Sequence, residues 1–171
     1  MNAAQAQQAP VKIKPATDDV IARLQAQWRQ SVVKTAAENK AEENIDELEV
    51  GTRMADGAIF AGISPDTELP IFVAPADEEV LLSFDKAQER AVEKSEEEGR
   101  EYRVPSASEL KMIFNSRAAI GGLNLTGDDP EGFYWSSTEV SDVYGRCQCF
   151  SNGQLHSDLR TSRNSVRLVR S

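Results

Sequence analysis

Apolar residues near the start of the chain recur at helical spacing. Residues 17–19, Thr-Asp-Asp, form a good helix start, and an apolar side chain then follows at every fourth position: Val20, Leu24, Trp28 and Val32. This spacing lines one face of an α-helix. The stripe fades into the polar run of residues 38–44, so the pattern predicts a helical extension over residues 17–50. The preceding residues 1–16 are rich in Ala, Gln and Pro and are predicted to be a disordered tail.

The apolar part of this extension, residues 17–35, has two interpretations. In the first, this helix mediates self-association or docks on a partner, because an exposed tryptophan in an apolar stripe marks a contact. Alternatively, it packs on its own domain. Both interpretations remain open at this point.

The domain proper is predicted to cover residues 51–171. Two apolar runs, residues 59–63 and 69–73, each follow a turn rich in Asp, Gly or Pro, which is typical of a β-meander. A helix should come next, with a Glu/Lys-rich outer face and an end near Gly99. Its inner face should consist of Phe84, Ala87, Ala91 and Val92.

A second helix carries a capping signal. Ser106 and Glu109 have the Ser-x-x-Glu form of a capping box, in which each side chain bonds the other residue's backbone amide. The helix should stop by the glycine pair at residues 121–122 and bury Leu110, Ile113 and Phe114.

The end of the chain is predicted to be a strand over residues 166–169. Arg167 and Arg170 alternate there with apolar residues, so they should face solvent, or else brace the chemically mixed loop that precedes the strand through charge-assisted hydrogen bonds.

Charge and composition narrow the classes of function. The net charge is −9, and residues 51–101 carry 5 basic and 13 acidic side chains, whereas residues 102–171 carry 8 and 7. The acidic middle argues against nucleic-acid binding, which needs a clustered basic face. No run approaches the roughly 18 apolar residues of a membrane span. The N-terminus lacks the basic start and apolar stretch of a signal peptide, so we expect a chain that is cytoplasmic at synthesis, or one that is exported by another route.

The two cysteines and the single histidine of the chain lie close together, at Cys147, Cys149 and His156. They provide no disulfide framework. They are also too few for a structural zinc site, which takes about four ligands. The simplest interpretation of the cysteines is small residues on a strand or loop. The acidic loop residues Asp128, Asp129 and Glu131 are expected to form an ordinary turn, because calcium takes about six to eight oxygen ligands. We therefore expect no cofactor and no metal.

Three motifs follow one another in the second half of the chain. They are Tyr-Arg-Val-Pro at residues 102–105, Tyr-Trp-Ser-Ser-Thr-Glu at residues 134–139, and Val-Arg-Leu-Val-Arg at residues 166–170. Together with the hairpin of residues 56–66, they resemble the DUF1566 or Lcl C-terminal family, a branch of the C-type lectin-like fold. The resemblance covers about residues 51–170. The family usually has Trp before Arg-x-Pro, where this chain has Tyr102.

The resemblance implies an α+β, C-type lectin-like domain preceded by the N-terminal helical segment. In this fold two helices flank a small twisted antiparallel sheet, and the N- and C-terminal strands pair. Tyr134 and Trp135 are then core anchors, since large aromatic side chains bury the most area.

A second resemblance concerns the residues between the last two motifs. Variable proteins of diversity-generating retroelements use this fold and display residues of the C-terminal strands and loops as a mutable surface. Diversification there acts at adenines, mainly in Asn codons, and such codons cannot encode Lys, Glu, Gln, Met or Trp. Residues 140–147, 149 and 155–159 obey this limit, whereas the fixed frame would include Gln148, Phe150, Gly153 and Gln154.

The two resemblances imply a non-enzymatic module that binds a protein or a glycan. The expected ligand-binding residues, which should share one solvent-facing surface, are Ser141, Asp142, Val143, Tyr144, Arg146, Cys147, Cys149, Leu155, His156, Ser157, Asp158 and Leu159.

Two alternatives come from other classes of protein. The lectin-like fold also hosts formylglycine-generating and related oxidoreductases, in which paired cysteines or histidines carry the chemistry. Here Cys147 and Cys149 lack the flanking motifs of those families, and one histidine cannot assemble a histidine-rich iron site. The second alternative is a structural subunit of a phage or secretion assembly, docked through the N-terminal helix.

Overall fold

The computed structural model of the protein describes residues 45–171. The chain divides after residue 46, and the second of the two units, residues 47–171, is compact. A short 3₁₀ helix, η1 (Ile45–Glu47), spans the division. The predicted tail, the predicted helix of residues 17–35 and its docking role lie outside the described residues. The second unit begins close to residue 51, where the sequence predicts the start of the domain.

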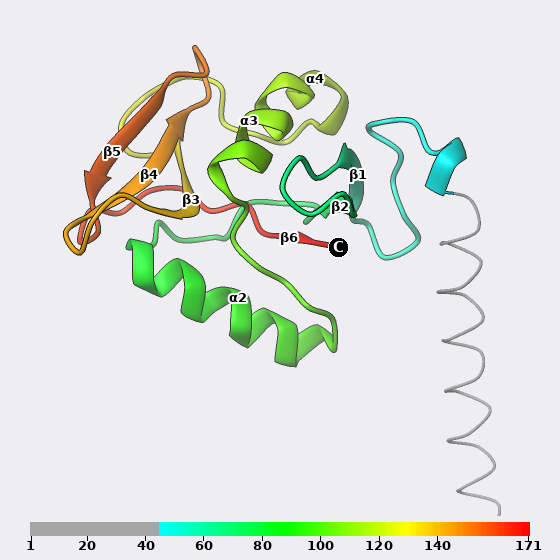
Figure 1. The fold of residues 1–171 in the computed structure, drawn as a ribbon, viewed down its shortest axis with the longest axis horizontal. Coiled ribbons are helices and arrows are strands. Elements are labelled where there is room, and N and C mark those ends of the chain that lie inside the picture. Colours follow the sequence, from blue (N-terminus) through cyan, green and yellow to red (C-terminus); the bar gives the residue numbers. More distant parts are fainter. Residues whose placement is uncertain (1–44) are drawn as a thin grey trace, which may run out of the picture. The chain divides into compact units, whose positions relative to one another are not determined.

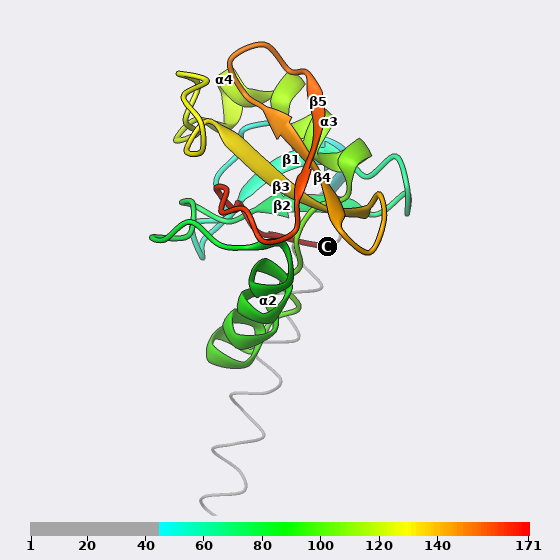
Figure 2. The same cartoon turned by 90° about the vertical axis from the view of Figure 1, so that its left-hand side faces the viewer.

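Residues 47–171 form an α+β unit with two small antiparallel sheets (Figures 1 and 2). One sheet has the strand order β1-β2-β6, formed by β1 (Ile59–Ile63), β2 (Pro70–Val73) and β6 (Val169–Arg170). The other has the order β3-β4-β5, formed by β3 (Phe133–Glu139), β4 (Tyr144–Cys149) and β5 (Leu155–Leu159). The α-helices of the described residues are α2 (Phe84–Glu98), α3 (Ala107–Asn115) and α4 (Arg117–Ile120), and none is long and apolar enough to cross a membrane.

The α+β class is confirmed, and the arrangement of strands differs from the expectation. Two sheets replace the single sheet expected. In the first, Val73 of β2 lies opposite both Ile59 of β1 and Val169 of β6. The C-terminal strand therefore pairs with the second strand of the meander, not with the first.

The predicted capping box fixes the start of α3. The hydroxyl of Ser106 accepts the amide of Glu109 at 3.1 Å, and the carboxylate of Glu109 accepts the amide of Ser106 at 2.9 Å. Glu109 is buried, and Arg103 and the hydroxyl of Ser64 donate to the same carboxylate. The helix packs on a core cluster drawn from both sheets through the three residues predicted for it, Leu110, Ile113 and Phe114.

Helix α2 packs on a second core cluster that includes Trp135, through Phe84, Ala87 and Ala91. It ends as predicted at Gly99, whose φ of 65° is a left-handed conformation that glycine adopts without steric cost. The prediction for Val92 is wrong, because its side chain is 59% exposed. One residue is about 100° of helical rotation, which carries Val92 from the buried face of Ala91 to the solvent side.

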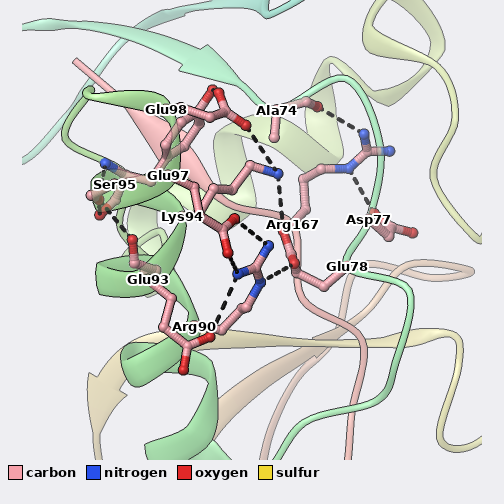
Figure 3. Close-up of polar contacts among 12 residues, drawn as sticks. Ala74, Asp77, Glu78, Arg90, Glu93, Lys94, Ser95, Glu97, Glu98 and Arg167 are labelled. Atoms are coloured by element: carbon pink, nitrogen blue, oxygen red, sulfur yellow. Dashed lines mark hydrogen bonds and ion pairs between the residues drawn. The ribbon is translucent and has the colours of Figure 1, made fainter.

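Ion pairs tie the outer face of α2 to the loop that follows β2 (Figure 3). Glu78 accepts hydrogen bonds from Arg90 at 2.7 Å and from Lys94 at 3.2 Å, and Arg90 also bonds Glu97 at 3.1 Å. The Glu78 side chain is only 8% exposed, so water screens these pairs less than it screens pairs at the open surface. They help to orient α2 under the rest of the domain.

The C-terminal segment departs most from the prediction. Residues 166–169 are buried, but only Val169–Arg170 forms a strand. Arg167 is buried as well: its Nε lies 2.6 Å from the carboxylate of Asp77, and one Nη atom donates to the carbonyl oxygen of Ala74 (Figure 3). The other Nη atom donates to the carbonyl oxygen of Gly122. Alternation predicts an exposed side chain only where one face of a strand meets water. This segment bonds to both sheets, so neither of its faces is free.

Candidate functional site

The predicted binding residues lie on and around the hairpin of β4 and β5. Tyr144 lies opposite Leu159 and Arg146 lies opposite Ser157. Directly opposed residues share a face of a sheet, so these four side chains leave the same face. Leu155 follows on this face, opposite the buried Gln148.

Five large apolar side chains around this hairpin are exposed, and we call them the apolar surface: Val140, Val143, Tyr144, Leu155 and Leu159. Tyr144 and Leu159, which face each other, are 44% and 42% exposed. The amides of Val140 and Ser141 both donate to the carbonyl of Tyr144 at 3.0 Å. These bonds hold residues 140–143, the loop between β3 and β4 that we call the entry loop, beside the strands. Exposed apolar clusters of this kind mark binding sites on soluble proteins.

An open depression of about 510 Å³ lies at the end of this hairpin opposite its connecting turn, where β4 begins and β5 ends. Its walls are formed by Asp85, Asp142, Val143, Leu159, Arg160 and Thr161. The guanidinium of Arg160 bonds the carboxylates of Asp85 and Glu139 and lies 4.8 Å from the centre of the Phe84 ring. The depression thus combines apolar side chains with charges of both signs, which suits a ligand with a mixed surface.

Buried side chains fix the β3-β4-β5 sheet against the start of α2. Trp135 is fully buried, its ring N–H donates to the carbonyl of Leu82 at 2.8 Å, and Phe84 meets it edge-on with 5.5 Å between ring centroids. Gly145 of β4 lies directly on Phe84, since a Cβ at this position would lie 2.3 Å from the Cδ2 atom of that ring. The strand therefore rests on the start of α2 and has no room for a side chain there.

His156 and Asp158 do not share the face of Tyr144, contrary to the prediction. They alternate with the exposed residues of β5 and are half-buried. The His156 ring packs against Phe133 with 5.3 Å between centroids. Asp158 accepts hydrogen bonds from the amide of Leu159, the last residue of β5, and from the side chains of Ser162 and Asn164 in the segment that follows. Asp158 therefore stabilises the backbone at the end of β5 and the segment that follows it.

The prediction that Cys147 and Cys149 face solvent is wrong. Both are buried with free thiols, and they leave the same face of β4 because they are two residues apart. Cys147 belongs to the core cluster of Trp135. Burial, aided by the negative charge of Asp158, raises the pKa of the Cys147 thiol to about 12. A thiol that stays protonated is a poor nucleophile, so Cys147 is a core residue.

Most residues expected in the fixed frame have structural roles. Gln148 and Phe150 are buried, and the Gln148 amide donates to the carbonyl of Gly153 at 2.9 Å. Gly153 has a φ of 76°, and a Cβ there would lie 2.3 Å from the Phe114 ring. Gln154 is the exception, because its side chain is exposed.

The ligand-binding residues expected from the sequence do not include four residues at this site: Asp85, Val140, Arg160 and Thr161. Only Asp85 lies outside the region of about residues 140–163 that the sequence predicts to face the ligand. Val140 lies in the stretch that obeys the codon limit, so the sequence already held a signal for it. Asp85 comes from α2, and nothing in the sequence indicates that the start of this helix meets the end of β5.

No group of three or more His, Cys, Asp or Glu side chains in residues 45–171 is arranged to hold a metal ion. No protein-family model matches the chain, and no curated protein matches it either.

Proposed function

We propose that residues 47–171 are a non-enzymatic binding module of the lectin-like class, which presents β4, β5 and their entry loop to a ligand. The observation that carries this proposal is the apolar surface, exposed on a hairpin whose strand β4 packs on the core through Cys147. Tyr144 belongs to this surface and Arg146 lies on the same face of the sheet, and tyrosine and arginine contribute strongly to interface energies. A rigid scaffold also lowers the entropic cost of ordering loops on binding.

A protein ligand fits this surface better than a glycan. Four of the five side chains of the apolar surface are aliphatic, and they gain free energy when another apolar surface removes them from water. Sugar rings stack on aromatic side chains, and the apolar surface offers only Tyr144 for this purpose.

The exposed residues of this surface also fit the variable set of a diversity-generating retroelement protein. Eight predicted positions keep their side chains largely away from the core: Ser141, Asp142, Val143, Tyr144, Arg146, Leu155, Ser157 and Leu159. They can change without loss of a core contact. The motif residues that suggest the DUF1566 family are, in contrast, buried at Tyr134, Trp135, Val166 and Leu168, as expected of a fixed frame.

The oxidoreductase alternative gains no support from the cysteines. The thiol of Cys147 is buried with a raised pKa, and Cys149 is buried beside Ser151, whose hydroxyl lies 3.2 Å from its sulfur. Neither thiol is open to a substrate in solution. A role as an assembly subunit is compatible with the binding proposal, since such a subunit also needs an exposed contact surface.

A pair of libraries tests the binding proposal. One is randomised at the exposed positions Tyr144, Arg146, Leu155, Ser157 and Leu159, and the other at the buried positions Trp135, Gly145, Cys147, Gln148 and Phe150. We expect most members of the first library to resist proteolysis and some to bind a purified test protein such as ubiquitin. Most members of the second should unfold. Equal loss of folding in both libraries, or no binders in the first, would contradict the proposal.

The neighbouring DNA tests the retroelement part alone. We expect a near-copy of the segment that encodes residues 140–160, with Asn codons at the exposed positions, beside a reverse transcriptase gene. If the flanking DNA holds neither, the retroelement part is wrong and the binding proposal still stands on the library experiment.

A further inference from the structure

Strand β5 forms an open edge of the second sheet. Among the described residues it pairs only with β4, and Figure 1 shows it as the outer strand of the β3-β4-β5 sheet. An unpaired edge offers a row of backbone donors and acceptors to another strand.

The hydrogen-bond pattern shows which residues face this edge. Backbone bonds link Arg160 to Val143 at 2.8 Å and Cys149 to Gln154 at 2.9 Å, one at each end of the hairpin. Bonded and non-bonded pairs alternate in an antiparallel ladder, so the even-numbered residues of β5 bond to β4. The odd-numbered residues Leu155, Ser157 and Leu159 direct their N–H and C=O groups to the open edge.

Two of these three residues have free backbone groups. Leu155 and Ser157 form no edge-side backbone bond among the described residues. The amide of Leu159 bonds the side chain of Asp158 at 2.7 Å, and its carbonyl accepts the amide of Ser162 at 2.8 Å. A carbonyl oxygen has two lone pairs, so that of Leu159 can accept one more donor.

We propose that this edge pairs with β5 of a second copy of the chain, antiparallel and centred on Ser157. The two Ser157 residues then exchange both backbone hydrogen bonds. Each Leu155 amide meets the Leu159 carbonyl of the other copy. The result is a six-stranded sheet that runs through a two-fold axis, which is the self-complementary form of interface that dimers use.

The sequence of β5, Leu-His-Ser-Asp-Leu, selects this register. Residues whose backbone groups face the edge must pair with each other. In every allowed register, odd-numbered residues of one β5 therefore lie opposite odd-numbered residues of the other. Centring on His156 puts histidine opposite histidine, and centring on Asp158 puts two carboxylates opposite each other, which is unfavourable. Only centring on Ser157 puts His156 opposite Asp158 on both sides of the axis.

The same register also covers apolar side chains. It places each Leu155 opposite Leu159 of the other copy, and these side chains are 46% and 42% exposed in one copy alone. Asp158 has room for a further donor, because a carboxylate accepts about four hydrogen bonds and this one accepts three. Asp158 is the only acidic side chain of β5, and this register places His156 of the other copy opposite it.

The dimer shares Leu155, Ser157 and Leu159 with the proposed ligand-binding surface, so the ligand of a dimer would meet residues 140–146. Residues 140–144 lie at the start of β4, one strand away from the two-fold axis. Two copies would therefore present two ligand-binding loops at once, which raises the apparent affinity for a repetitive target.

Sedimentation velocity of the full chain, from about 10 μM to about 1 mM, tests the dimer. A single edge pairing buries less area than a standard interface, so we expect reversible dimerisation at the upper end of this range. Ser157→Pro removes an edge-facing amide that β4 does not use, and it should abolish the dimer. Ser157→Ala keeps the amide and should retain it. A chain that stays monomeric, or self-association that Ser157→Pro leaves intact, would overturn the proposal.

Two further experiments test the register with substitutions other than proline. His156→Asp should weaken dimerisation roughly tenfold, because it opposes two carboxylates on each side, whereas His156→Lys should retain it. Ser157→Cys should form a disulfide between copies on oxidation, since Cα atoms of such a bonded pair lie about 5.5 Å apart. Leu155→Cys, away from the axis, should not. Equal crosslinking at both positions, or equal dimerisation of the two His156 variants, would overturn the register.

Discussion

Arg167 and Asp77 form an ion pair in which the arginine is completely buried, with its Nε 2.6 Å from the carboxylate. The hydroxyl of Tyr134 donates to the same carboxylate at 2.6 Å and accepts the amide of Asn124 at 2.7 Å. Burial raises the pKa of Asp77, although Arg167 opposes this effect. The pair joins the C-terminal segment to two loops and to the core of the second sheet.

Replacing Arg167 should therefore be costly. Arg167→Leu leaves Asp77 without its cation, and breaking a buried pair costs about 3–5 kcal/mol of unfolding free energy, as urea denaturation would measure. Arg170→Leu is the matched control: its ion pair with Asp56 is partly exposed, so about 1 kcal/mol is expected. Equal losses for the two variants would show that the buried pair has no special role.

Glu109 should make the stability of the domain depend on pH. Burial alone would raise its pKa, but Arg103, Ser64 and the amide of Ser106 together hold the pKa below its ordinary value of 4.5. The unfolded chain then binds more protons, so this contribution is fully present above about pH 5.5 and is lost as the pH falls through the folded pKa. Glu109→Gln should lower stability at neutral pH and flatten its dependence below pH 5.5, whereas exposed Glu131→Gln should do neither.

Gly145 should resist substitution although it lies among the exposed residues of the hairpin. Gly145→Ala places a Cβ against the Phe84 ring, and overpacking of this kind costs about 1–3 kcal/mol. Thermal unfolding would measure the loss, with Ser157→Ala on the neighbouring strand as the control. An unchanged melting temperature in Gly145→Ala would mean that Phe84 moves aside at no cost.

The exposed positions of the hairpin should tolerate replacement together. Changing Ser141, Asp142, Tyr144, Arg146 and Leu155 at once should shift the melting temperature by only a few degrees, because surface substitutions usually cost under about 0.5 kcal/mol each. Cys147→Tyr, which obeys the same codon limit, should unfold the domain because position 147 lies in the core. If Cys147→Tyr is tolerated as well as the surface set, exposure does not separate variable from fixed positions.

Residues 47–171 should fold without the preceding residues. Leu48 packs on the apolar cluster of Phe60 and Phe72, so the cut should fall before it, after residue 46. The fragment should show a cooperative thermal transition close to that of the full chain by circular dichroism. A fragment that is unfolded at room temperature would show that residues 1–46 belong to the fold.

Local signals in the sequence predicted the local structure well. The capping box at Ser106 and Glu109, the glycine end of α2 and the two strands of the meander all depend on neighbouring residues, and all are confirmed. The prediction for Val92 failed because a single step along a helix changes the face, and the sequence does not show how wide the buried face is.

Long-range contacts were the part that the sequence could not supply. Alternation suggested that Arg167 faces solvent, yet two sheets cover its segment and Asp77, 90 positions earlier, neutralises it. The codon limit likewise permits both Cys147 and Tyr144, so the sequence predicted both as exposed binding residues. Only the structure separates them, because residues that a codon permits can be either buried or exposed.

The position of the C-terminal segment has a consequence for biosynthesis. Ser165 bonds Phe133 and Trp135 of the second sheet, while Val169 bonds Arg103 and pairs with β2 of the first. On the ribosome this segment emerges after everything it joins, so neither core can close until about residue 170 is free. A chain cut short within the hairpin lacks the segment that holds the two sheets together, and proteases would remove it before it could compete with intact molecules.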